Sequence, residues 1–303
     1  MTTLLTGGTG FVGRQLMKAW HARSSELITC SRDAERARKA FGSSAPRIIA
    51  WDPLKPIDSD LPSSLSAVIN LMGESIADGR WTAAKKKRIV DSRVVGTRNL
   101  VTGILNSNCL PSVLVSASAV GIYGNCGEDL VSEKHALSTG FLADVCQQWE
   151  AEANRLGEHG VRVVNLRIGI VLGADGGALE QMEPIFRWGV GGRLGSGKQW
   201  VPWIHVDDLV RLILWSVDET VIQGPVNATA PNPVRNSELT AELARRVGRP
   251  AWLPVPKFAV RLAFGEFANS LFDSQRVVPE IALRHGFRYE FPELRETFED
   301  LLR

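Results

Sequence analysis

The stretch TGGTGFVG, residues Thr6 to Gly13, decides the fold of this chain. It stands directly after the apolar run TTLLT and directly before FVGRQLMKAW, in which apolar residues recur at helical spacing. Glycines at this junction let the chain turn sharply and bring bare backbone amides against a phosphate at a helix N-terminus. The stretch therefore predicts a strand-turn-helix unit that binds the pyrophosphate of a dinucleotide, with a glycine-rich turn lacking a ligand as the alternative. The predicted contacts are Gly7, Thr9, Gly10, Phe11, Val12 and Gly13.

Outward from this turn, short apolar runs alternate with longer amphipathic stretches, which is typical of β-α-β units and a parallel sheet. Strands are predicted at residues 2–6, 26–30, 47–50, 67–71, 112–117 and 161–168. Helices are predicted between them at residues 11–22, 33–41, 82–106 and 142–159. The expected fold class is α/β, a Rossmann-like doubly wound parallel sheet.

The pattern changes after about Gly169, where glycine becomes dense and proline recurs later. We expect residues 1–170 to form the dinucleotide-binding domain, with residues 206–230 returning to it. Residues 171–303 are expected to form a smaller, loop-rich substrate or lid part that ends in a helical segment. Helices are predicted there at 206–217, 236–247 and 257–272, the second with Asn236 or Ser237 as its N-cap.

Composition excludes several classes of protein. Of the 303 residues 44% are hydrophobic and 22% charged, as in soluble globular proteins, and the net charge of +2 creates no field that would recruit nucleic acid or a membrane. No apolar run has the length of a membrane span and the chain does not start like a signal peptide, so we expect a cytoplasmic protein. The four cysteines are far apart, which predicts reduced thiols and neither a disulfide nor a metal site. Nothing in the pattern indicates an oligomeric state.

The end of the second strand predicts which dinucleotide is bound. NAD calls for a carboxylate at this strand tip, whereas NADP calls for a hydroxyl and a guanidinium that hold the 2′-phosphate. The sequence has Ser31 and Arg32 first, followed by Asp33, which is placed to cap the next helix. We therefore predict NADP rather than NAD, with a solvated surface charge as the alternative for Arg32.

Further cofactor contacts are predicted where later strands end. Asp52 can accept a hydrogen bond from the adenine amino group, or form a turn before Pro53. Asn70 and Gly73 follow the fourth strand, where Gly73 lets backbone approach the cofactor and Asn70 is alternatively a buried amide bonded to loop backbone. Ser116 completes the predicted set at the end of the fifth strand.

The loop SASAVGIYG, residues Ser116 to Gly124, places Ser118 and Tyr123 beside the nicotinamide, because ligands of open sheets bind at the carboxyl ends of strands. Together with TGGTGFVG, NLMGE, GTRNL and WIHVDDL in this order, it resembles the extended short-chain dehydrogenase/reductases, the NAD(P)-dependent epimerase/dehydratase family. The resemblance spans about residues 1–230 and is nearest to an uncharacterised nucleotide-sugar-epimerase-like subgroup with an extra C-terminal helical segment.

The resemblance implies a catalytic serine, matched by Ser118, and a Tyr-x-x-x-Lys pair on the following helix. That pair is absent, since Leu142 and Cys146 occupy the best matching register. Tyr123 or a water is then the predicted proton source. Arg93 stands where the family often has asparagine, three residues before Gly96.

Val201 stands where many family members have an arginine that binds substrate phosphate. In its place Trp200 and Trp203 can stack on a planar ligand and Lys198 can hold an anion, or the two tryptophans pack between the lobes. His205 is expected to orient the loop from the interior rather than to act in catalysis.

Two functions remain compatible with this sequence. The first is an NADP-dependent oxidoreductase or epimerase acting on an unknown small molecule, with Ser118 binding a substrate hydroxyl or carbonyl. The second is a non-catalytic NADP-binding sensor or scaffold protein, which the missing Tyr-x-x-x-Lys pair favours.

Overall fold

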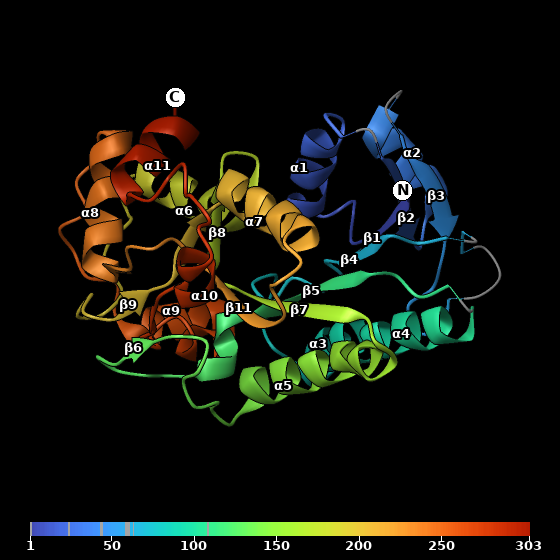
Figure 1. Cartoon of the computed structure of the whole chain (residues 1–303). Coiled ribbons are helices and arrows are strands. Elements are labelled where there is room, and N and C mark those ends of the chain that lie inside the picture. The colour runs from blue at the N-terminus through green and yellow to red at the C-terminus, as the bar shows by residue number, and fades with distance from the viewer. Residues whose placement is uncertain (1, 24, 43–44, 58–60, 63, 108) are drawn as a thin grey trace.

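A seven-stranded parallel sheet forms the centre of the protein (Figure 1). The computed structural model describes residues 2–23, 25–42, 45–57, 61–62, 64–107 and 109–303. The strand order is β11-β7-β5-β4-β1-β2-β3, which is a doubly wound arrangement as predicted. Its strands are β1 (Thr2–Thr6), β2 (Glu26–Ser31), β3 (Arg47–Ala50), β4 (Ala67–Asn70), β5 (Val113–Ala119), β7 (Arg162–Ile168) and β11 (Gly224–Ala228).

Helices cover both faces of this sheet because successive strand residues point to opposite sides. In β1, Leu5 packs in the cluster formed with α1 (Phe11–Trp20) and α7 (Val206–Asp218). Leu4 packs in the opposite cluster, formed with α4 (Gly96–Asn106) and the end of α5 (Phe141–Asn154). The nearly continuous apolar strands are thus buried on both faces, as parallel sheets require.

The long predicted helix at 82–106 is continuous but changes its winding. It consists of α3 (Ala83–Val90), a π-helical turn at Asp91–Val95, and α4. The predicted helix at 142–159 likewise ends in a 3-10 turn, Arg155–His159, after α5. Helix α2 (Ala34–Phe41) begins after Asp33, whose side chain accepts from the Arg36 N–H as an N-cap, as predicted.

The smaller lobe packs around Trp203 and lies beside the sheet (Figure 1). Its core joins α6 (Gly177–Arg187), α8 (Asn236–Val247) and α11 (Leu294–Leu301). Helix α6 corrects the expectation of long loops after Gly169. The predicted N-cap of α8 is also wrong, because Arg235 holds that position and its backbone N–H donates to the Glu238 carboxylate at 2.9 Å.

The lobe's remaining elements are short. They are β8 (Ile170–Gly173), β9 (Trp200–Val201), β10 (Trp203–His205), β12 (Val234–Arg235), α9 (Lys257–Phe264), a 3-10 turn (Gly265–Asn269) and α10 (Glu280–Arg284).

The C-terminal segment returns to the loop that follows β5. Strand β13 (Arg276–Val277) pairs with β6 (Leu130–Val131), and the Gln275 side-chain amide donates to the carbonyls of Val120 and Gly124 at 2.9 and 2.7 Å. Residues after the sheet thereby help to hold the SASAVGIYG loop in place. Within the described part of the chain, every helix is too short or too polar to cross a membrane.

Candidate functional site

The glycine turn between β1 and α1 is packed so closely that two positions tolerate no side chain. Gly7 has φ +72°, and a Cβ there would lie 2.5 Å from the Leu71 carbonyl oxygen. A Cβ on Gly13 would lie 2.3 Å from the Gly7 carbonyl oxygen. These contacts pack the turn against the end of β4 and let α1 begin directly above β1.

The N-terminus of α1 is open to a ligand. Gly10 is its N-cap, no side chain accepts from the first-turn amides, and the first turn contains no acidic residue. Thr9 and Gly10 are exposed, and a Cβ on Gly10 would meet only the Gly7 carbonyl oxygen, at 3.2 Å. The first-turn N–H groups and the helix dipole together favour an anion here. A pyrophosphate fits this cradle.

Arg32 directly follows β2, and its side chain is exposed there. The Ser31 hydroxyl bonds the backbone of Asp33, donating to its carbonyl oxygen at 2.9 Å, while the Asp33 carboxylate caps α2. Arg32 is exposed and forms no hydrogen bond or ion pair with any residue that the structure describes. Its guanidinium is therefore available to an anionic ligand, and Asp33 is not free to bind ribose hydroxyls with both oxygens.

Asn70 and Ser116 stand near the carboxyl ends of their strands, but both side chains are buried. Asn70 is fully buried, where its Oδ1 accepts from the Thr6 hydroxyl at 2.6 Å and its Nδ2 donates to Thr97 and Ser116 at 2.9 and 3.2 Å. These side chains tie together the carboxyl ends of β1, β4 and β5. Asp52 is exposed and accepts a backbone N–H two residues on at 3.0 Å, which is the turn named as its alternative.

Ser118 and Tyr123 belong to one buried network centred on Arg167 of β7. The Ser118 hydroxyl donates to Glu150 at 2.7 Å, and Arg167 binds both carboxylate oxygens of Glu150 at 2.9 Å. Arg167 also donates to the Tyr123 hydroxyl at 2.9 Å, which in turn donates to Asn227 at 2.7 Å. The network joins β5, α5, β7 and β11.

The Tyr123 hydroxyl has no free hydrogen-bonding role toward a substrate in this geometry. Its side chain is 2% exposed, and burial raises its pKa to about 12 despite the nearby Arg167. Proton donation by Tyr123 would require its bond to Asn227 to break. Ser118 is equally buried, at 2% exposed, with its proton committed to Glu150.

Helix α5 carries Leu142 and Cys146 in the register where the resemblance implies a tyrosine and a lysine. Leu142 is partly buried near Gly121, where a Cβ on that glycine would lie 3.6 Å from the Leu142 Cβ. Cys146 is buried, and burial raises the pKa of its thiol to about 12. All four cysteines are free thiols.

The three residues predicted to bind substrate occupy different environments. Trp203 is fully buried and its indole N–H donates to the Asn232 carbonyl at 3.2 Å, so only the packing alternative describes it. Trp200 is partly exposed, but the Arg235 and Arg276 guanidinium carbons lie 4.1 and 4.7 Å from its ring centre. Lys198 is exposed on the adjoining turn.

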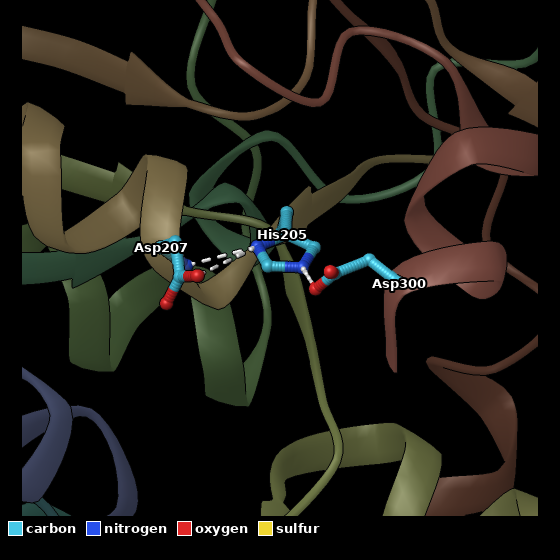
Figure 2. Close-up of side chains that lie close together, drawn as sticks. All are labelled: His205, Asp207 and Asp300. Carbon is cyan, nitrogen blue, oxygen red and sulfur yellow. Dashed lines mark hydrogen bonds and ion pairs between the residues drawn. The ribbon is translucent and has the colours of Figure 1, made fainter. Parts of the chain in front are cut away.

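His205 lies in the interior, as expected from the sequence, and its ring contacts residues of both α7 and α11. Figure 2 shows its ring between Asp207 and Asp300: Nδ1 accepts the Asp207 backbone N–H at 3.0 Å, and Nε2 lies 3.3 Å from the Asp300 carboxylate. The ring stacks on Phe291 with centres 3.9 Å apart. These three side chains are the one group of His, Cys, Asp and Glu in the described residues that is close enough to hold a metal ion. Both ring nitrogens are already bonded, so the arrangement is that of a structural link.

A pocket of about 200 Å³ lies between the start of α5 and the C-terminal segment. Trp81, Phe141 and Leu142 supply apolar walls, and Glu266 and Asp273 supply carboxylates. Asp273 forms no hydrogen bond or ion pair within the described residues, and burial raises its pKa. This pocket was not predicted from the sequence, because its two sides are more than a hundred residues apart in the chain.

The sheet order and the glycine turn define a dinucleotide-binding α/β protein. Residues 3–228 match the NAD dependent epimerase/dehydratase family, and residues 255–301 match DUF1731, a domain of unknown function. The chain therefore belongs to this epimerase/dehydratase family.

Relatives and solved structures agree along the whole chain. The chloroplastic SDR39U1 homolog of Arabidopsis thaliana is 38% identical over 100% of this chain and 87% of its own length. The human epimerase family protein SDR39U1, solved with NADPH, is 33% identical, with TM-score 0.90 over 100% of this chain and 99% of its own. UDP-glucuronic acid 4-epimerase from Bacillus cereus, 15% identical with TM-score 0.78 over 100% of this chain and 98% of its own, shares the fold.

The buried network yields a stability prediction. Arg167→Met leaves the Glu150 carboxylate buried without its counter-ion, so we expect the free energy of unfolding to fall by about 3–5 kcal/mol in urea titrations. Adding Glu150→Gln should recover part of that loss, because no unpaired charge remains. The matched control is Arg155→Met, which removes a partly exposed ion pair and should change stability by less than about 1 kcal/mol. Equal effects of the two single substitutions would contradict this account.

His205 yields a pH prediction. Burial lowers the pKa of His205 below its usual 6.5, more than Asp207 and Asp300 raise it. On acidification the unfolded chain therefore takes up this proton first, so the stability that His205 contributes is present above about pH 6.5 and is lost as the pH falls below it. Unfolding free energies of the wild type minus those of His205→Gln should rise with pH across this range. A difference that is flat, or that falls with pH, would show that the folded-state pKa is not lowered.

Proposed function

We propose that this protein binds NADP(H) along the carboxyl edge of the sheet. The observation that carries the proposal is the guanidinium of Arg32 at the tip of β2, which has no partner among the residues that the structure describes, combined with the use of Asp33 as a helix cap. A cation beside a carboxylate that already caps a helix suits a 2′-phosphate rather than two ribose hydroxyls. The open N-terminus of α1 suits the pyrophosphate. The NADPH solved with human SDR39U1, a similar protein, supports the same choice.

The cofactor, when bound, supplies or accepts a hydride. On that basis we propose an epimerase-family or reductase-type reaction on a small molecule, held in the pocket between α5 and the C-terminal segment. Trp81 and Phe141 would exclude water from one side of that molecule, and the carboxylate of Asp273, which forms no hydrogen bond within the described part of the chain, would bind a hydroxyl or amine on the other. The carboxylates of Glu266 and Asp273 would repel a phosphate group, so we expect a substrate that carries none.

A second candidate function is a non-catalytic NADP(H)-binding sensor or scaffold. It is favoured by the bonding of Ser118 and Tyr123, whose hydroxyls both serve the interior network. In this alternative the cofactor would act as a ligand that changes association with another molecule.

Cofactor choice is tested by calorimetric titration with NADPH and NADH. We expect NADPH to bind about tenfold to a hundredfold more tightly, since a charge-assisted contact contributes roughly 1.5–3 kcal/mol. Arg32→Ala should remove this preference by weakening NADPH alone. Equal affinities in the wild type, or an unchanged preference in Arg32→Ala, would refute the assignment. Gly10→Val serves as the negative control: it should fold, because a Cβ there would meet only the Gly7 carbonyl oxygen, at 3.2 Å, yet bind neither dinucleotide.

Turnover separates the two candidate functions. We expect epimerisation of nucleotide sugars to be absent or very weak, because losing a positioned general acid lowers a rate by roughly 10² to 10⁴. A substrate screen would follow NADPH absorbance, and NMR would detect redox-neutral epimerisation. Any activity found would be remeasured in Ser118→Ala and Tyr123→Phe, and unchanged rates would remove both hydroxyls from the mechanism. Robust epimerisation of a nucleotide sugar would overturn the expectation.

A further inference from the structure

The pocket between the start of α5 and the C-terminal segment contains a carboxylate that is paired with no cation of the described chain. Asp273 lines this pocket of about 200 Å³ and is partly buried. Within the described residues its carboxylate accepts no hydrogen bond and forms no ion pair. Lys257 lowers the pKa of Asp273 from a distance, but burial raises it by more. A partly buried negative charge without a direct counter-ion favours a ligand that supplies one.

The second carboxylate at the pocket already has its cation. The Lys86 ammonium pairs with Glu266 at 2.7 Å and lies 5.0 Å from the centre of the Phe141 ring. An ammonium is stabilised where a carboxylate and the face of an aromatic ring both reach it. The protein thus binds one of its own ammonium groups with two of the residues that line this pocket.

Trp81 supplies a second aromatic face to the same pocket. Its indole N–H donates to the Ile76 carbonyl at 2.8 Å, which fixes the ring and leaves it no donor for a ligand. The ring packs on Phe141 and Phe267, with ring centres 5.2 and 5.5 Å apart. In the part of the chain that the structure describes, no lysine or arginine stands over this ring. The pocket therefore offers a ligand one carboxylate and one aromatic face that are not used by the protein's own cations.

Gln275 adds a buried acceptor to the pocket wall. It is 8% exposed, and its amide nitrogen donates to the Val120 and Gly124 carbonyls, which uses both of its N–H groups. The side-chain oxygen accepts no hydrogen bond within the described residues, so Gln275 can offer a ligand only an acceptor. The first turn of α5 also borders the pocket and favours negative charge, but Asp144 already places a carboxylate in that turn.

We propose that this pocket recognises an ammonium group, so that the substrate is a small molecule carrying a protonated amine on an apolar body. Asp273 binds the ammonium by a charge-assisted hydrogen bond, Trp81 contacts it through the ring face, and the Gln275 oxygen accepts a further N–H. The inference rests on the proposed function, from which it takes the pocket as the substrate site, and it selects the amine over the hydroxyl. Asp273 is then the residue that determines substrate specificity.

Three aromatic compounds of similar size test this assignment. Benzylamine is an ammonium at neutral pH, benzyl alcohol is its uncharged counterpart, and benzoate carries the opposite charge. Binding would be measured by ligand-observed NMR titration of the full chain, with and without NADPH. We expect benzylamine to bind the wild type about tenfold to a hundredfold more tightly than benzyl alcohol, and benzoate to bind more weakly than either.

Asp273→Asn keeps the size of the side chain and removes its charge. It should lower the affinity for benzylamine to that for benzyl alcohol, while the affinity for benzyl alcohol changes by less than about twofold. A collapsed pocket would instead weaken both compounds. The matched control is Asp129→Asn, an exposed aspartate on the loop before β6 that does not line the pocket, and it should bind all three compounds as the wild type does.

The outcomes separate this inference from the proposed function. Benzyl alcohol or benzoate binding as tightly as benzylamine, no binding of any of the three, equal weakening of benzylamine and benzyl alcohol by Asp273→Asn, or an unchanged preference in that variant would each overturn the inference. NADPH binding is measured in the same samples, so these results leave the cofactor assignment intact. A wild type that binds benzylamine but not NADPH would refute the cofactor assignment and leave the ammonium site in place.

Discussion

The buried ion pair between Arg167 and Glu150 is the interaction on which the rest of the sheet edge depends. Both side chains are nearly inaccessible, at 5% and 10% exposed, so each charge is tolerated only because the other is present. The pair fixes α5 against β7, and its remaining donors and acceptors fix Ser118 and Tyr123. Through Asn227 the same network reaches β11 and the Val278 carbonyl of the C-terminal segment, at 2.9 Å. Residues that resemble catalytic groups in the sequence therefore act first as structural ones.

The sequence predicted the parts of this fold that depend on local pattern. Six strands were identified because apolar runs and flanking turn residues mark them, and the glycine turn was identified because Gly7 and Gly13 permit contacts that no other residue allows. Strand β11 was not identified as a strand, since it opens with Gly224 and Pro225, residues that strands disfavour except at an edge. Helix α6 was missed for a related reason: its glycine-rich surroundings resemble a loop.

The candidate site was predictable only in part. The glycine turn, Ser31 and Arg32 were predicted from their places in the first βαβ unit. Arg167 and Glu150 gave no signal, because their partners are distant in the chain and a charged residue inside a strand usually faces solvent. Arg93 was noticed as a departure from the family pattern, yet its position beside Gly73 and Trp149 requires the three-dimensional structure. Spatial neighbours far apart in sequence thus account for most of what was missed.

The order of the strands also has a consequence for how the chain folds during synthesis. Strand β7 ends at Ile168, but its outer neighbour β11 begins only at Gly224, after β8, α6, β9, β10 and α7 have been made. Until then β7 is an unprotected edge whose backbone groups can pair with another chain. Closing so long a connection is slow, because the chain loses conformational entropy before the β7–β11 contacts form. A nascent chain halted within this interval would therefore be prone to aggregation. Once β11 pairs with β7, that strand edge is covered.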